Sequence, residues 1–133
     1  MLKRNRTLLS LAAGSLILSG CDVPDREEVR KRQHLPAADF VANPENGKTL
    51  FQQHCASCHG VTIRGTDQGP PLIHHTYRPQ HHADQTFHWA VKGGVKQHHW
   101  HFGNMPAQRH VSPEMAGDII AYVRREQRKA GIR

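Results

Sequence analysis

The segment "CASCH", residues 55–59, is the feature that most constrains this chain, because two of its three cysteines lie three positions apart with a histidine after the second. Such a pair serves a redox-active disulfide, a zinc site or covalent haem attachment. A redox-active pair usually lies at a strand-to-helix junction, and no segment here alternates like a strand. A structural zinc site needs four ligands, and the third cysteine, Cys21, belongs to a different motif.

Covalent haem attachment places a simpler demand on the sequence. Two thiols add to the two vinyl groups, and the next residue, His59, lies directly below the iron as its proximal ligand. The spacing C-x-x-C-H meets this demand in five residues. A haem site of this kind predicts a second axial ligand and a loop that braces the histidine.

Met105, which directly precedes Pro106 in "FGNMPA", is the candidate for the second axial ligand. A thioether is a soft, neutral ligand that favours Fe(II) and raises the reduction potential. Met115 is the competing thioether, but its spacing places it on the apolar stripe of the last expected helix.

The stretch "GPPL", residues 69–72, is the candidate brace. Proline restricts this turn, so a backbone carbonyl can accept a hydrogen bond from the second ring nitrogen of His59 and fix its orientation. Pro70 is favoured over Pro71 as the residue that supplies this carbonyl.

Three helices are expected, with ordered loop between them, no strand and no internal repeat. The first begins after the cap candidate Asn43 and delivers the cysteines, the second covers residues 83–94, and the third runs from the cap Ser112 to about Lys129. Apolar side chains recur at helical spacing in the third helix, namely Met115, Ile119, Tyr122 and Val123. The fold class is therefore predicted to be all-α.

From about residue 43 to 130 the chain resembles the class I c-type cytochromes. In that family a glycine and an aromatic four residues later lie where the first helix crosses the last, which carries an aliphatic residue and an aromatic three residues later. Gly47 and Phe51 match the first pair, and Ile119 and Tyr122 match the second. The resemblance implies a cytochrome c-like fold, with three main helices and ordered loops around one covalent haem.

The resemblance also implies the roles of individual residues. Cys55 and Cys58 attach the haem, His59 and Met105 are the axial ligands, and Pro70 braces the histidine. With both axial positions filled, no catalytic residue is expected and the protein is expected not to be an enzyme. Trp89 resembles, more loosely, the aromatic of the family's middle helix, which packs near a haem propionate.

The N-terminus has the layout of a secretory signal, with Lys3, Arg4 and Arg6 before an apolar run that is too short to span a bilayer. "LSGC" resembles the lipobox of bacterial lipoproteins, which makes Cys21 the lipid attachment site, and Asp22 resembles an inner-membrane retention signal. We therefore expect a cleaved signal peptide at 1–20, a tether with at most one short helix at 21–42, and the cytochrome c domain at 43–133.

Charge gives no sign of nucleic-acid binding. The chain has 18 Lys and Arg against 11 Asp and Glu, and loss of residues 1–20 removes only basic side chains. A basic cluster near residues 124–129 suits the C-terminal end of a helix.

The 12 histidines exceed what a small haem protein needs, and several lie in "IHHTYRPQHH" and "KQHHWHFGNM". His98, His99 and His101 are candidates for a secondary copper, zinc or nickel site. Solvent-facing histidines are the alternative, and His99 or His101 could also replace Met105 on the iron.

The expected function is a lipid-anchored, monohaem electron carrier on the periplasmic face of the inner membrane. Its partners would be a membrane respiratory complex or a periplasmic oxidoreductase, and the protein would be a monomer or a loosely bound subunit. The main alternative is a metal-handling or metal-sensing haem protein that uses the histidine-rich loops for copper or zinc. A small peroxidase is a weaker alternative.

Overall fold

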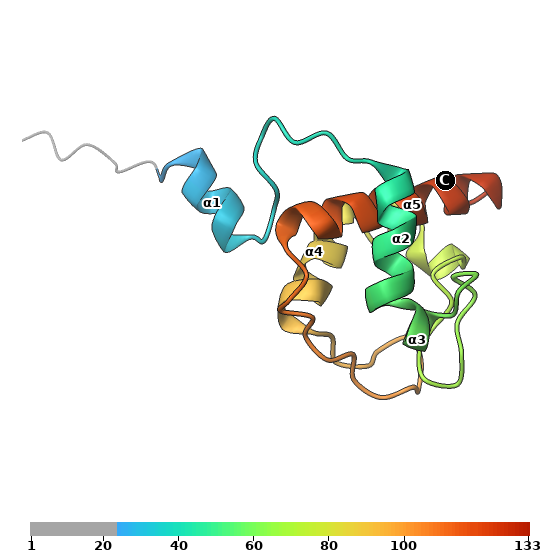
Figure 1. Cartoon of the computed structure of the whole chain (residues 1–133). Coiled ribbons are helices and arrows are strands. Elements are labelled where there is room, and N and C mark those ends of the chain that lie inside the picture. Colours follow the sequence, from blue (N-terminus) through green and yellow to red (C-terminus); the bar gives the residue numbers. More distant parts are fainter. Residues whose placement is uncertain (1–23) are drawn as a thin grey trace, which may run out of the picture.

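The structure is a computed structural model that describes residues 24–133 (Figure 1). The expected signal segment 1–20, the lipid attachment residue Cys21 and its neighbour Asp22 lie outside the described residues. Within residues 24–133 the regular elements are all helical. They are α1 (Arg26–Arg32), α2 (Pro44–His54), α3 (Ala56–His59), the 3₁₀ turn η1 (His75–Tyr77), α4 (Asp84–Gly93) and α5 (Pro113–Lys129). The predicted all-α fold class is confirmed.

The starts of α2 and α5 follow from local chemistry. The Asn43 side chain accepts hydrogen bonds from the backbone N–H groups of Glu45 and Asn46, at 2.9 and 3.2 Å. The Ser112 hydroxyl accepts one from the backbone N–H of Met115 at 3.2 Å. A proline follows each cap, where its missing N–H costs no helical hydrogen bond.

Helices α2 and α5 cross in close contact, as Figure 1 shows, and this crossing forms one side of the core. At the crossing, Gly47 lies against the backbone of Asp118, where a Cβ atom would overlap the Asp118 carbonyl group. The Phe51 and Tyr122 rings pack beside it with their centroids 5.8 Å apart. The absence of a side chain at Gly47 therefore lets the aromatic residues of the two helices meet.

A buried carboxylate ties the same two helices together. Asp118 accepts a hydrogen bond from the backbone N–H of Asn43 at 2.6 Å and another from the Asn46 side-chain amide at 2.7 Å. Hydrogen bonds to a charged acceptor are stronger than neutral ones, so they help to hold the start of α2 on α5.

Helix α4 packs on the other part of α5, where Arg124 is the main polar link. Its side chain is only 7% exposed and donates to the Asp84 carboxylate and to the Tyr77 carbonyl, both at 2.7 Å. It also donates to the carbonyl of His82. One buried guanidinium thus fixes the start of α4 and the loop before it.

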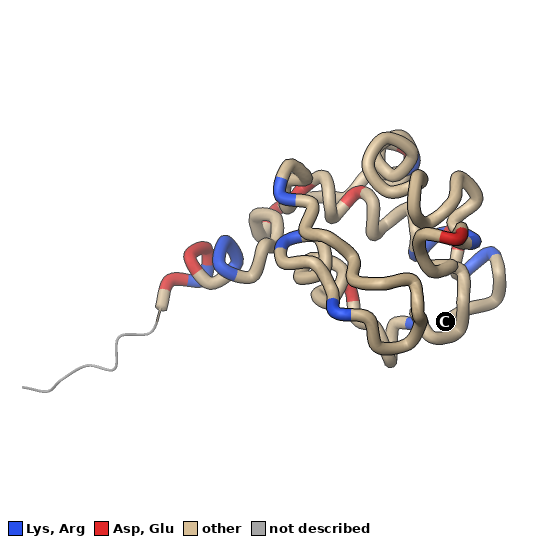
Figure 2. Tube along the Cα trace, turned by 90° about the horizontal axis from the view of Figure 1, so that it is seen from below, with Lys and Arg blue, Asp and Glu red and all other residues tan. Residues whose placement is uncertain are grey.

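The segment that we expected to be a tether holds one short helix, α1, with acidic residues in its first turn and basic residues in its last (Figure 2). After α1 the chain lies against the domain rather than apart from it. The His34 ring pairs with the carbonyl of Val111 at 3.1 Å, and the Phe40 ring lies against Gly117 of α5. Contacts with the domain therefore extend into the expected tether, from Phe40 back to Arg32 among the described residues.

Among the described helices, none combines the length and the apolar character that crossing a membrane requires.

Candidate functional site

A cavity of about 650 Å³ opens between α2, α3, α4, α5 and the loop that precedes α5. Its volume falls within the range of small-molecule and cofactor sites. The side chains that line it are mostly apolar or aromatic, and they include Phe51, Leu72, Phe87, Val91 and Ile119. Such a cavity suits a large planar apolar group far better than a polar metabolite.

His59 lines the cavity from the last residue of α3. Its Nδ1 donates a hydrogen bond to the Pro70 carbonyl at 2.9 Å, because a carbonyl can only accept. The proton is thereby held on Nδ1, which leaves the lone pair of Nε2 available to a metal. Burial lowers the pKa of His59 and so favours the neutral ring that a metal requires.

The loop between the cysteines and Pro70 is fastened to α3 by further hydrogen bonds. The hydroxyl of Thr66 donates to the Cys58 carbonyl at 2.6 Å, and the backbone N–H of Gly65 donates to the His59 carbonyl at 2.8 Å. The turn that carries Pro70 is thus held against the motif it braces.

Cys55 and Cys58 are both free and half-buried. Cys55 lines the cavity and is the residue that precedes α3. Burial, with a smaller contribution from the neighbouring Cys58, raises the pKa of the Cys55 thiol to about 11. The motif therefore presents two free thiols beside the candidate proximal histidine, which is what covalent haem attachment needs.

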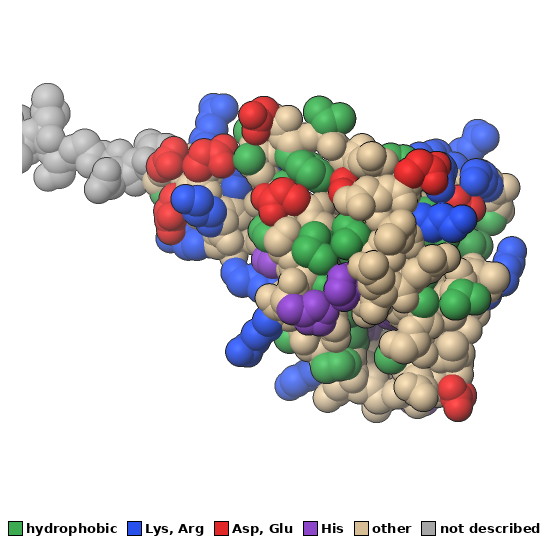
Figure 3. All heavy atoms as spheres, viewed as in Figure 1, with side chains coloured by type: hydrophobic (Ala, Val, Ile, Leu, Met, Phe, Trp, Pro, Cys, Tyr) green, Lys and Arg blue, Asp and Glu red, His purple; other side chains and the backbone are tan. Residues whose placement is uncertain are grey.

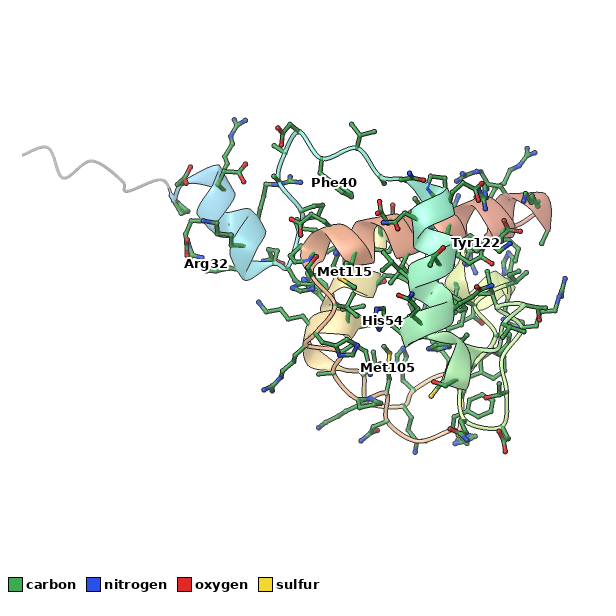
Figure 4. All side chains as sticks on the ribbon, in the orientation of Figure 1. Arg32, Phe40, His54, Met105, Met115 and Tyr122 are labelled. Atoms are coloured by element: carbon green, nitrogen blue, oxygen red, sulfur yellow. The ribbon has the colours of Figure 1, made fainter. Side chains whose placement is uncertain are left out.

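Met105 also lines the cavity, from the loop that leads to α5. Its backbone forms an antiparallel bridge with Val95, with N···O distances of 3.0 Å in both directions. Gly94 has a φ of 75°, a conformation that favours glycine, and a Cβ there would clash with the Met105 carbonyl. The competing residue Met115 lies on α5, packs against the core and is not among the cavity residues (Figure 4).

Among the polar groups of the cavity residues, one bears on the kind of ligand that fits. The indole Nε1 of Trp100 is buried and has no hydrogen-bond partner among residues 24–133. A buried donor without an acceptor is costly, so it calls for an acceptor on the ligand. Haem fits both features, since its porphyrin is apolar and planar and its propionates are carboxylates.

Both Trp89, which sequence reasoning named, and Trp100, which it missed, line the cavity. Trp89 is 50% exposed, and its indole N–H already donates to the side chain of Gln33 at 2.8 Å. The available signal was a tryptophan that lies five residues before the candidate axial methionine, inside a polar and histidine-rich stretch.

The structure changes the membership of the candidate secondary metal site. His99 lies with His81 and His82, and each of the three offers a ring nitrogen within 4.8 Å of the others. His98 stays close, with its ring centroid 4.3 Å from that of His99. His101 is exposed and does not belong to the cluster. The loop near residues 81–82 has no periodicity, so its approach to His99 could not be predicted.

The family model for cytochrome c matches residues 44–126. Comparison with curated proteins and with solved structures found no match. The matched region runs from the first residue of α2 into α5 and contains the haem-attachment motif, Pro70 and Met105. Members of this family bind haem c covalently, and the size of the domain fits one haem. The chain belongs to the cytochrome c family.

Proposed function

We propose that this protein is a one-electron carrier whose single haem iron is held between His59 and Met105. The observation that carries the proposal is that both side chains line the same apolar cavity, and that each is fixed by its backbone surroundings. The haem supplies the one-electron chemistry when it is bound. The protein's own contribution is to orient the two ligands and to keep water away from them.

The ligand pair favours transfer of electrons over catalysis. A thioether from Met105 raises the reduction potential, and the hydrogen bond from His59 to Pro70 fixes the orientation of the imidazole. Two side-chain ligands leave no open position at which a substrate could bind the iron. The apolar lining of the cavity keeps the dielectric constant low around the group that changes charge.

The proposal extends to the location of the protein. The secretory signal and the lipobox-like "LSGC" support a lipid anchor at Cys21 on the periplasmic side of the inner membrane. Contacts with the domain include the end of α1, where the Arg32 carbonyl accepts a hydrogen bond from Lys92 and the Gln33 side chain accepts hydrogen bonds from Gln85 and Trp89. From Cys21 to the start of α1 the chain can reach at most about 18 Å, and the helix Arg26–Arg32 adds about 10 Å, so the domain would stay close to a membrane partner such as a respiratory complex.

Methionine substitutions in the haem-loaded protein test the ligand assignment. The oxidised wild-type protein should show the weak far-red charge-transfer band of a sulfur-ligated ferric haem, and its reduced form should resist carbon monoxide. Met105→Ala should abolish the band, lower the reduction potential and admit carbon monoxide. Met115→Leu, a swap that nearly conserves volume, is the matched control and should change none of these.

The opposite pattern would refute the assignment. If Met105→Ala keeps the wild-type spectrum, and His99→Ala or His101→Ala changes it, the sixth ligand is a histidine. If the wild-type protein binds carbon monoxide readily, the iron has an open position and the carrier function is wrong.

The lipid anchor is tested by fractionation. Wild-type protein should sediment with membranes and release fatty acids on hydrolysis, and Cys21→Ser should move the haem-loaded protein to the soluble fraction. Equal distribution of the two proteins would contradict a lipid anchor at Cys21.

A further inference from the structure

Three histidines from two separate segments converge at the rim of the haem cavity. His81 and His82 precede α4, and His99 lies in the loop that leads to Met105. The Nε2 atoms of His81 and His99 are 3.2 Å apart, and one ring nitrogen from each of the three residues lies within 4.8 Å of the others. The rings of His82 and His99 are 5.1 Å apart between centroids.

These distances suit a tetrahedral transition-metal site. Zinc binds imidazole nitrogens at about 2.0 to 2.1 Å, so two ligands of one tetrahedral ion lie about 3.3 Å apart. The pair His81 and His99 already has this separation. One ring nitrogen of His82 lies within 4.8 Å of both, so rotation of its side chain would complete a set of three ligands.

A hydrogen bond holds the proton of His82 on one ring nitrogen, as in histidines that bind metals. Its Nδ1 donates to the Thr76 carbonyl at 2.8 Å, which leaves the lone pair of Nε2 free. Its own backbone carbonyl accepts a hydrogen bond from the buried Arg124. Histidines that bind metals commonly donate their other ring N–H to a carbonyl or carboxylate in this way.

The cluster also favours neutral rings, because protonated rings would repel one another. Burial and the neighbouring histidines lower the pKa values of His82 and His99. Their lone pairs are therefore available near neutral pH, where protons compete weakly with a metal.

A second histidine pair in the molecule provides a comparison. His54 and His110 also bring their ring nitrogens within 3.2 Å of each other. Figure 4 labels His54, and Figure 3 shows histidine side chains on the molecular surface in the same view. No third ligand joins this pair among the described residues, so it lacks the three ligands of a chelating site.

We propose that His81, His82 and His99 form a binding site for one divalent ion of the Zn²⁺ or Cu²⁺ type, separate from the haem iron. Imidazole nitrogens suit these ions, and three such ligands leave a fourth position for water or for the nearby His98. The bound ion would add positive charge at the rim of the haem cavity. Positive charge there stabilises Fe(II) relative to Fe(III) and raises the reduction potential of the haem.

Calorimetric titration of the oxidised, haem-loaded protein with zinc chloride tests the site. Wild-type protein should bind one equivalent, and His82→Ala or His99→Ala should each weaken binding at least tenfold. His110→Ala is the matched control, because it removes one of two paired imidazoles outside the cluster, and it should leave the affinity unchanged. His101→Ala should also leave it unchanged. The absorption spectrum of each variant verifies folding and haem loading. His99→Asn is a second variant of the same ligand, in case His99→Ala does not fold.

Absence of stoichiometric zinc uptake would overturn the proposal. So would a His99 variant that binds zinc as tightly as the wild type, or a His110→Ala variant that loses as much zinc affinity as the His82 and His99 variants. A second measurement is the haem reduction potential with and without one equivalent of Zn²⁺. The potential should rise in the wild type and not in His99→Ala, and a bound ion that leaves it unchanged would place the site away from the cavity rim and overturn the assignment. The measurement of the reduction potential rests on the proposed haem function. If that function is wrong, the absorption spectrum recorded without zinc shows it independently of the zinc titration.

Discussion

Replacement of Gly47 by alanine should destabilise the protein although alanine is the better helix former. A Cβ at this position would overlap the carbonyl group of Asp118 and lie 3.0 Å from the Ile119 nitrogen. Both neighbours are backbone atoms of α5, so no side chain can rotate out of the way. The two helices must therefore separate by about 1 Å at the crossing, which forfeits a quarter to a half of the dispersion energy of facing atoms.

The expected net loss can be worked from three contributions. Overpacking of this kind costs about 3 kcal/mol, and the higher helix propensity of alanine returns about 1 kcal/mol. The separation also stretches the hydrogen bonds from Asn43 and Asn46 to Asp118 and the contact between Phe51 and Tyr122. We therefore expect Gly47→Ala to lower the free energy of unfolding by at least about 2 kcal/mol.

Denaturant unfolding of the oxidised haem protein, followed by circular dichroism, measures this loss. Gly93→Ala is the matched control, since Gly93 also lies in a helix but has open space where the Cβ would be. It should leave stability unchanged or raise it by about 0.5 kcal/mol. Equal stability of Gly47→Ala and the wild type would refute the view that the α2–α5 contact requires glycine.

Three further predictions concern the segments around the site. Arg124→Lys should lower the free energy of unfolding by about 2 kcal/mol in denaturant titration, because one ammonium cannot replace the bonds to Asp84 and the Tyr77 carbonyl, and unchanged stability would contradict this. Burial, and to a smaller extent the neighbouring His34, lowers the pKa of His88 in the folded protein. As the pH falls below the ordinary histidine pKa of 6.5, His88 is therefore protonated in the unfolded chain before it is protonated in the folded one. The free energy of unfolding should therefore decrease as the pH falls from 6.5 to the lower pKa of the folded protein, and His88→Gln should flatten this dependence on pH. An equally steep dependence in the variant would mean that another group causes it. Phe40→Ala should speed proteolysis between residues 33 and 42 without altering the haem spectrum, because the ring lies against Gly117 (Figure 4), and an unchanged cleavage rate would mean that the ring does not hold the segment.

The parts of the fold that sequence reasoning predicted correctly depend on local chemistry or on strict spacing. The caps Asn43 and Ser112 act within three residues of themselves, so they marked the starts of α2 and α5 without knowledge of the tertiary structure. The hydrogen bond from His59 to Pro70 was also expected, and the structure contains it.

The parts that sequence reasoning did not predict depend on loops. The approach of His81 and His82 to His99 joins two segments without periodicity, and the burial of the Trp100 indole rather than Trp89 depends on the path of the same loop. The docking of His34 and Phe40 on the domain was missed because residues 21–42 are rich in charge and poor in large apolar side chains. A few well-placed contacts were enough to hold such a segment.

The bridge between Val95 and Met105 closes the intervening nine residues into a loop whose two ends are hydrogen-bonded to each other. Insertions or replacements inside this loop need not displace Met105, because its backbone is hydrogen-bonded to Val95 where the two ends of the loop meet. The loop that carries His98, His99 and His101 is therefore free to change during evolution while Met105, the proposed iron ligand, keeps its position. Homologues could acquire or lose an auxiliary metal site there without rebuilding their redox centre.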